Sequence, residues 1–192
     1  MNYLLDSHTH TVASGHAYST VLEMARAAAE KGLELLCITD HAPGMEGTTC
    51  RDYFANSRVI DRELFGVQIM VGAELNLMDC EGRMDLDTAM LAKLDLAIVS
   101  LHTKCLPTGG CAETYTHGLL EAMKNPYVNI IGHPDDGRYP LDYPALVRAA
   151  GEAGVLLEVN NSSLTPGSFR VDAPRHCAEM LRECKKQGVP VV

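Results

Sequence analysis

Three histidines gather near the start of the chain: His8 and His10 in the segment Asp6-Ser7-His8-Thr9-His10, and His16 six residues further on. The segment follows a short apolar run, which is typical of a β-strand. Because side chains alternate faces along a strand, His8 and His10 are expected to point the same way. Two imidazoles on one face at a strand end are suited to binding a single transition-metal ion. A surface loop that is merely rich in histidine is the alternative.

Further candidate ligands stand at the ends of the next four apolar runs, in chain order: His41, Glu74, His102 and His133. A closed or nearly closed barrel brings five such strand ends around one cavity. An open doubly wound sheet would draw its site from two or three strands at one switch point. The barrel is therefore favoured. With His8, His10 and His16, the candidates exceed the four ligands of a usual zinc site, and the Glu74 carboxylate can bridge two ions.

We therefore expect two or three clustered divalent ions, with zinc as the first choice and manganese or iron as alternatives, since all three accept imidazole–carboxylate mixtures. Such a cluster lowers the pKa of a bridging water and clamps the oxygens of a phosphoester. Asp40, beside His41, is a candidate ligand, proton acceptor or partner that orients an imidazole. An N-cap of the following turn is its alternative. His117 and His176 fall inside expected helices and are assigned to surface or packing positions.

Apolar runs of strand length alternate with helix-period segments along the chain. The expected strands cover residues 3–7, 35–39, 67–73, 96–100, 128–131, 155–159 and 189–192. The expected helices cover residues 20–31, 52–64, 86–94, 113–124, 142–153 and 172–187. Thr20 with Glu23 forms a capping box, and Asp142 and Asp172 are expected N-caps. Repeated βα units predict a parallel sheet with helices outside it, in one domain over residues 1–192.

The bulk composition excludes several classes of protein. A net charge of −9 argues against broad binding to nucleic acid. No apolar run approaches the ~20 residues that a membrane helix needs, and the N-terminus lacks a signal-peptide pattern, so we expect a cytoplasmic protein. The seven cysteines are odd in number and form no C-x-x-C pair, which favours reduced thiols. Cys37, Cys177 and Cys184 are expected to be small buried apolar residues.

Several of these segments resemble successive motifs of the PHP (polymerase and histidinol phosphatase) family. They are Asp6-x-His8-x-His10-Thr11, Thr39-Asp40-His41, Gly72-Ala73-Glu74, Leu101-His102 and Gly132-His133-Pro134. Two more resemble the YcdX-type phosphatases within that family: Ser14-x-His16-Ala17-Tyr18-Ser19 and Leu157-Glu158-Val159-Asn160-Asn161-Ser162-Ser163. The resemblance implies a distorted (β/α)7, TIM-like barrel, a trinuclear metal site and hydrolysis of phosphoesters.

The resemblance also implies how the ligands are shared among the ions. One ion would take His8, His10 and Glu74. A second would share Glu74 with His102 and His133. A third would take His16 and His41. In the family, a Gly-Ser-Asp-x-His-like motif follows the seventh strand, whereas this chain ends at Val192, where that motif would begin. We therefore expect a C-terminally truncated PHP domain, and the weakest metal binding at His16.

The function expected from the sequence is that of a hydrolase, a metal-dependent phosphatase or phosphoesterase that cleaves a small phosphorylated substrate through a metal-activated hydroxide. Asp40 or solvent would handle protons. Arg138, Asn161 and Arg170 are candidate substrate residues, with solvated loop charges as the alternative for both arginines. The competing hypotheses are a metal-dependent amidohydrolase or deaminase, and a catalytically crippled metal-binding PHP module. The sequence predicts neither the substrate nor the oligomeric state.

Overall fold

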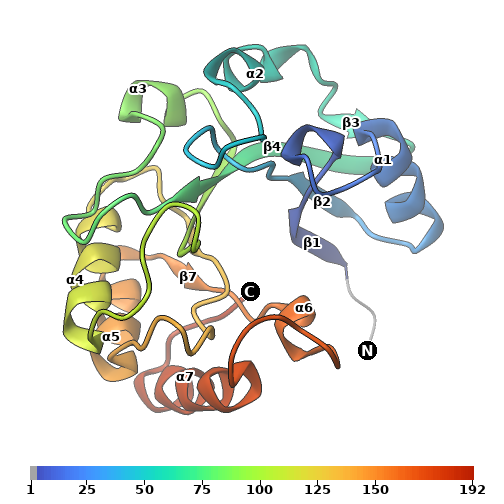
Figure 1. The fold of residues 1–192 in the computed structure, drawn as a ribbon. Helices are drawn as coiled ribbons and strands as arrows, with labels where there is room; N and C mark the ends of the chain where they lie inside the picture. The colour runs from blue at the N-terminus through green and yellow to red at the C-terminus, as the bar shows by residue number, and fades with distance from the viewer. Residues whose placement is uncertain (1–3) are drawn as a thin grey trace. The chain divides into compact units, whose positions relative to one another are not determined.

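The chain folds as two compact units in a computed structural model that describes residues 4–192 (Figure 1). Unit 1 comprises the chain up to Leu75 together with Asp85–Ile98, and unit 2 comprises Asn76–Met84 and Val99–Val192. The single domain expected over residues 1–192 stays a prediction. Among the described residues, none of the helices has the length and apolar character that crossing a membrane requires.

Unit 1 is built on parallel strands that lie side by side in Figure 1. They are β1 (Leu5–Thr9), β2 (Leu35–Ile38), β4 (Val67–Asn76, the last residue in unit 2) and the first three residues of β5 (Leu96–Ser100). The pairing of β2 with β4 is in continuous register, from Leu35 opposite Gln68 to Ile38 opposite Val71. These strands confirm the sequence-based prediction, with β1 ending two residues later than expected and Tyr3 outside the described residues.

Helix α1 (Val21–Glu30) packs on this sheet and begins as the sequence predicts. Both halves of its capping box are present, since Thr20 accepts a hydrogen bond from the Glu23 N–H and the Glu23 carboxylate accepts one from the Thr20 N–H. Such a box satisfies two backbone donors that a helix start leaves open. The buried face of the helix, Ala25 and Ala28, joins one apolar core with residues of β2 and β4: Leu36, Ile38, Val67, Ile69 and Val71.

The helix expected over residues 52–64 is wrong in its second half. The segment forms α2 (Arg51–Ala55), a 3-10 turn η2 (Ser57–Val59) and the short strand β3 (Glu63–Leu64), which pairs antiparallel with β4. The two residues between β3 and β4, Phe65 and Gly66, have φ values of 54° and 79°. Positive φ at both positions is the backbone of a tight two-residue hairpin, which turns the chain before a helix can continue. Further on, α3 (Thr88–Leu91) is shorter than the expected helix over residues 86–94.

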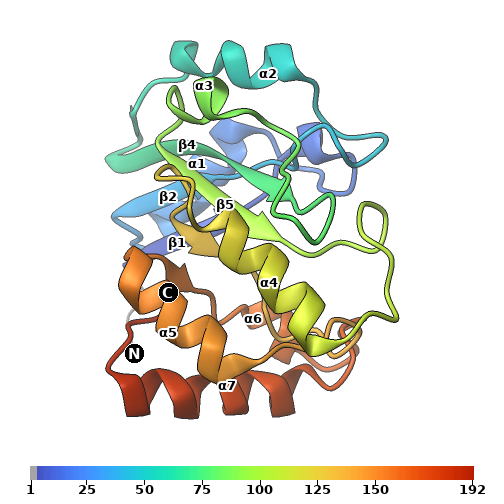
Figure 2. The ribbon, with the colours of Figure 1, turned by 90° about the vertical axis from the view of Figure 1, so that its left-hand side faces the viewer.

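Unit 2 continues the alternation of strands and helices. Its parallel strands are the end of β5, β6 (Ile130–Ile131) and β7 (Leu156–Leu157), and Val191 makes an isolated parallel bridge to Leu157. Its helices are α4 (Ala112–Ala122), α5 (Tyr143–Ala153), α6 (Asn161–Leu164) and α7 (Ala173–Gln187). Helix α5 packs against both α4 and α7, and the α5–α7 pair is visible in Figure 2. Between β4 and α3 the chain turns back on itself around Gly82, so that Leu77 makes an antiparallel bridge to Met84.

Of the two N-caps expected in unit 2, Asp142 is confirmed and Asp172 is wrong. Asp142 caps α5 by accepting a hydrogen bond from the Ala145 N–H, as predicted. Asp172 is not a side-chain cap, because its backbone is left-handed (φ 50°) instead of the extended form that an N-cap takes. After β7 the chain forms the one-turn helix α6, which the Asn160 side chain caps by accepting a hydrogen bond from the Ser163 N–H.

All seven cysteines are free thiols. Cys37, Cys177 and Cys184 are at most 3% exposed, which confirms their expected role as buried packing residues. Cys184 and Cys177 share the buried apolar face of α7 with Met180, whereas Leu181 is 37% exposed. The thiols therefore differ strongly in their surroundings.

These surroundings predict an order of thiol reactivity. A hydrogen bond with the Thr114 hydroxyl, at 3.0 Å from the sulfur, lowers the pKa of exposed Cys111, while burial raises the pKa of Cys37 to about 12. Because the thiolate is the nucleophile, we expect iodoacetamide at pH 7.5 to alkylate Cys111 first and Cys37 last in the folded protein. Peptide mass spectrometry over a time course measures the order. Alkylation of Cys37 as fast as Cys111 would contradict the prediction, and urea-unfolded protein is the control in which the difference disappears.

Candidate metal centre

His8 and His10 stand at the end of β1 with their rings close together. The ring centroids are 5.1 Å apart and the two Nε2 atoms are 3.2 Å apart. His8 is the penultimate residue of β1 and His10 follows its last residue, Thr9. Thr9 is anchored to the next strand, since its N–H donates to the Thr39 hydroxyl and its own hydroxyl donates to the Cys37 carbonyl. The strand therefore aims both imidazoles at the same point, as the alternation of side chains predicts.

Glu74 places a buried carboxylate among these rings. It lies near the end of β4, is 1% exposed, and its N–H donates to the Asp40 carbonyl. Its Oε1 is 3.3 Å from His8 Nε2, and its Oε2 is 3.3 Å from His10 Nε2 and 2.8 Å from His41 Nδ1. One carboxylate thus contacts three imidazoles, with its two oxygens facing different partners. That is the geometry of a carboxylate able to bridge two ions.

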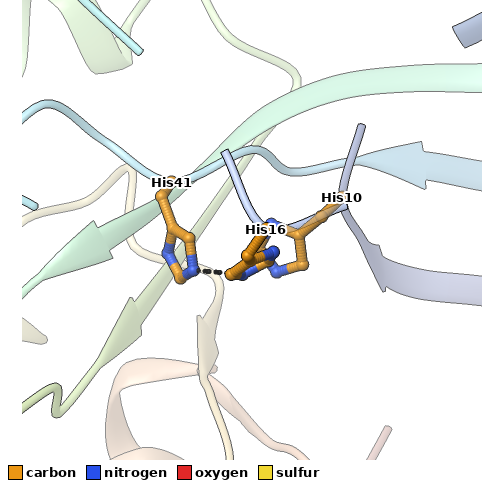
Figure 3. A group of neighbouring side chains, drawn as sticks. All are labelled: His10, His16 and His41. Atoms are coloured by element: carbon orange, nitrogen blue, oxygen red, sulfur yellow. Dashed lines mark hydrogen bonds between the residues drawn. The ribbon is translucent and has the colours of Figure 1, made fainter. Parts of the chain in front are cut away.

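His16 and His41 meet beside this carboxylate. Their Nε2 atoms are 2.9 Å apart, and Figure 3 shows both rings together with His10. The loop returns His16 to the site through the 3-10 turn η1 (Val12–Ser14) and Gly15, whose φ is 73°. A Cβ at Gly15 would lie 2.4 Å from the Gly47 carbonyl oxygen, so this turn requires glycine. Ligand atoms of His10, His16 and His41 all lie within 4.8 Å of one another.

The surroundings of His16 favour the form of this residue that can bind a metal. Desolvation lowers the pKa of His16, and the neighbouring His10 and His41 lower it further. A neutral imidazole has the lone pair that a metal ligand needs.

Unit 1 brings together four imidazoles and one carboxylate, a donor set that suits zinc, manganese or iron. Of the sequence-predicted ligands, unit 1 contains His8, His10, His16, His41 and Glu74, and it brings all five together.

Asp40 precedes the candidate ligand His41 in the chain, and both oxygens of its carboxylate accept hydrogen bonds. Its carboxylate is 0% exposed and accepts from the Thr11 N–H and hydroxyl (2.7 Å each), the Ser14 hydroxyl (2.6 Å) and the Tyr53 hydroxyl (2.5 Å). Four donors fill the acceptor positions of a carboxylate. Of the roles considered for Asp40, this arrangement favours the one that orients neighbouring groups.

Unit 2 holds the two remaining predicted ligands. His102 follows β5, and its Nδ1 lies 2.7 Å from the Asn76 side-chain oxygen. His133 follows β6, and its ring centroid is 5.4 Å from that of His102. The backbone of His133 has a positive φ of 29°, and its N–H donates to the Glu158 carboxylate at 2.6 Å. Positive φ in a residue with a side chain is costly and is found disproportionately at functional sites.

The three candidate substrate residues differ in what already surrounds them. The Arg138 guanidinium is paired with the Asp136 carboxylate, which accepts from both its Nε and an Nη atom. Arg170 donates to two neutral oxygens, Ser163 Oγ and Asn160 Oδ1, and no carboxylate of residues 4–192 lies within ion-pair distance of it. Asn161 is exposed at the start of α6. Of the two arginines, Arg170 is the one without a direct ion pair among residues 4–192, although its charge acts on Asp135, whose carboxylate accepts from the same Ser163 hydroxyl.

Sequence reasoning missed four residues that support the candidate ligands. Asn76 and Glu158 stand beside His102 and His133, while Ser14 and Tyr53 contact Asp40. The signal for Asn76 was present, because it lies two residues after Glu74 in β4 and so on the same face. Tyr53 had no such signal, since α2 brings it to Asp40 from a separate part of the chain. The two histidines assigned to helices are indeed in helices, with His117 on the surface of α4 and His176 buried in α7.

Comparison with known proteins shows what the whole chain is similar to. A family model described as the PHP domain matches residues 6–134. A probable phosphatase of Thermoanaerobacter sp. (strain X514) is 44% identical over 191 residues, which cover 100% of this chain and 77% of that protein. A probable phosphatase of Caldanaerobacter subterraneus subsp. tengcongensis is 46% identical over 191 residues, 100% of this chain and 74% of that protein.

A solved structure shares the fold. It is the histidinol phosphate phosphatase of Lactococcus lactis subsp. lactis Il1403, complexed with zinc, L-histidinol and phosphate. The TM-score is 0.60 at 18% identity, over 96% of this chain and 81% of that one. The likeness confirms the expected fold class, an α/β fold of the TIM-like type.

The α/β fold carries an imidazole–carboxylate cluster that could hold several metal ions. The chain belongs to the PHP domain family. Its relatives are named phosphatases, which confirms the predicted class of enzyme.

Proposed function

We propose that this protein is a metal-dependent phosphoesterase that hydrolyses a small phosphorylated molecule. The observation that carries the proposal is the convergence of four imidazoles on the Glu74 carboxylate in unit 1. The phosphatase names of its relatives, which cover the whole of this chain, support the reaction class.

We assign the ligands as the family resemblance implies. His8, His10 and Glu74 would hold one ion, His102 and His133 would hold a second that also takes Glu74, and His16 with His41 would hold a third. The contacts of Glu74 Oε1 and Oε2 with different rings support its role as a bridge. Zinc is the first choice, which the zinc in the Lactococcus lactis enzyme supports, and manganese and iron accept the same donors.

When bound, such ions lower the pKa of a coordinated water and neutralise charge on a phosphoryl group. The chain's own residues hold and orient the reacting groups. Glu74 fixes the ligands relative to one another, and Arg170 binds the phosphate. Asp40 keeps the loops that carry His10, His16 and His41 in place, and leaves proton transfer to solvent. The complex of the Lactococcus lactis enzyme with L-histidinol and phosphate supports a small phosphomonoester as the substrate class.

Elemental analysis combined with a phosphatase assay tests this function. We expect the purified protein to contain at least one equivalent of zinc, manganese or iron, and to hydrolyse p-nitrophenyl phosphate. Dialysis against a chelator should remove both metal and activity, and the matching ion should restore them. Metal-loaded protein that hydrolyses amides or deaminates bases, without phosphatase activity, would favour the amidohydrolase or deaminase hypothesis. Metal-loaded protein without any of these activities would favour a binding module.

Substitution of Arg170 tests the phosphate site. We expect Arg170→Ala to lower kcat/KM for a phosphomonoester about 10- to 100-fold, mainly through KM, because hydrogen bonds to charged groups contribute ~1.5–3 kcal/mol. Arg138→Ala is the matched control, because its guanidinium is already paired with Asp136. Steady-state kinetics on both variants measure the difference. A larger loss in Arg138→Ala than in Arg170→Ala would contradict the assignment.

A further inference from the structure

A single buried hydroxyl, that of Ser14, contacts both a candidate metal ligand and the backbone of another. Ser14 is the last residue of η1 and is 2% exposed. Its Oγ lies 2.6 Å from Asp40 Oδ1, 2.9 Å from His10 Nδ1 and 3.0 Å from the backbone nitrogen of His41. Three contacts converge on an atom that has one proton to give.

The position of that proton follows from its partners. The Asp40 carboxylate has only acceptor oxygens, so the Ser14 hydroxyl donates to it. The backbone N–H of His41 is a donor, so Ser14 Oγ accepts from it. With its one proton committed to Asp40, Ser14 Oγ has only a lone pair for His10. His10 therefore carries its proton on Nδ1 and donates it to Ser14.

This tautomer leaves the lone pair of His10 on Nε2. That atom lies 3.3 Å from Glu74 Oε2 and 3.2 Å from His8 Nε2, at the centre of the ligand cluster. In free histidine the neutral ring prefers the proton on Nε2, so the Nδ1–H form must be imposed by a partner. A hydrogen bond to the other ring nitrogen is the usual way in which proteins orient a metal-binding imidazole.

Asp40 is itself held so that it cannot turn away from Ser14. Its remaining acceptor positions are taken by the N–H and hydroxyl of Thr11 and by the Tyr53 hydroxyl. Burial, together with the hydrogen bond to Asp40, raises the pKa of Tyr53, so this phenol stays protonated and continues to donate. The orientation of the Asp40 carboxylate is thereby fixed from three sides, and with it the direction of the Ser14 proton.

We propose that Ser14 is a positioning residue that locks His10 in the Nδ1–H tautomer with Nε2 free to bind metal, and that Asp40 acts through Ser14 instead of on the substrate. The metal-binding part of this inference rests on the proposed function, whereas the tautomer is a property of the metal-free chain. Through the His41 N–H, the same hydroxyl also ties the loop after β1 to the residues that follow β2.

Long-range proton–nitrogen NMR of metal-free, nitrogen-15-labelled protein at pH 8 tests the tautomer directly. We expect the His10 Nδ1 shift to be that of a protonated ring nitrogen and the Nε2 shift to be that of an unprotonated one. The Ser14→Ala variant should shift His10 toward the Nε2–H form, while Ser14→Thr, which keeps the hydroxyl, should retain the wild-type pattern. Ser57→Ala, at another buried serine of unit 1, is the control expected to change nothing.

Metal affinity provides the second readout. In chelator competition, we expect Ser14→Ala to weaken zinc binding about 10- to 100-fold, the range found for partners of metal-binding histidines, and Ser14→Thr to recover most of the loss. A wild-type His10 with its proton on Nε2, or a Ser14→Ala variant with unchanged tautomer and affinity, would overturn the inference. If the protein bound zinc but cleaved no phosphoester, the proposed function would fail while both readouts still decided the role of Ser14.

Discussion

Glu74→Gln is expected to lose most of its bound metal and to lower kcat/KM for a phosphomonoester by at least about 100-fold. The substitution keeps the shape of the side chain but replaces a negative oxygen, in contact with His10 and His41, by an amide that cannot bridge two cations. Loss of a partner that only orients a ligand already costs 10- to 100-fold, so loss of a shared ligand should cost more. Elemental analysis and steady-state kinetics on the same preparation measure both effects.

An exposed glutamate of unit 1 provides the control for this result. Glu63 lies in β3 with its side chain exposed, and Glu63→Gln removes the same charge without reaching the ligands. We expect its metal content and activity to match the wild type. Glu74→Gln protein with full metal content and activity would remove the main support for a carboxylate-bridged cluster.

Asp40→Ala is expected to lower the free energy of unfolding by roughly 3–5 kcal/mol. The change leaves four donors without their acceptor in a fully buried place, and each such loss costs ~1–3 kcal/mol before the surroundings relax. Urea denaturation followed by circular dichroism measures the difference. Asp61→Ala, at an exposed aspartate of the same unit, should change the stability by less than about 0.5 kcal/mol.

The outcome also separates the roles considered for Asp40. A positioning role predicts that stability and metal content fall together in Asp40→Ala and partly recover in Asp40→Asn, which keeps one acceptor oxygen. A variant with wild-type stability and metal content but no turnover would instead identify Asp40 as a proton acceptor in the reaction.

The strand ends and the positions of the candidate ligands were predictable because simple rules of strand geometry determine both. Strand side chains alternate, so His8 and His10 share a face, and a polar residue after an apolar run falls at the end of a parallel strand. That rule located His41 and Glu74 without knowledge of tertiary contacts. It also explains why β1, β2 and β4 were found almost within their expected bounds.

The hydrogen bonds that hold Asp40 next to the candidate ligands were not predictable from the sequence, because they join segments that are far apart in the chain. Tyr53 lies in α2, and its hydroxyl donates to Asp40, 13 residues earlier in the chain, a contact that no pattern in the sequence indicates. The expected helix over residues 52–64 was likewise interrupted by a tertiary contact, because the tight hairpin at Phe65 and Gly66 pairs β3 with β4.

Five of the seven candidate ligands come early in the chain, which has a consequence for biosynthesis. His8, His10, His16, His41 and Glu74 all precede residue 75, and the strands that carry them, β1, β2 and β4, pair in the order of their synthesis. At ~5–20 residues per second, a ribosome completes these strands seconds before it reaches residue 192. An ion in the cell can therefore bind these residues before synthesis of the chain reaches residue 192. The metal supplied to the culture, and not only the metal added after purification, should determine what the protein carries.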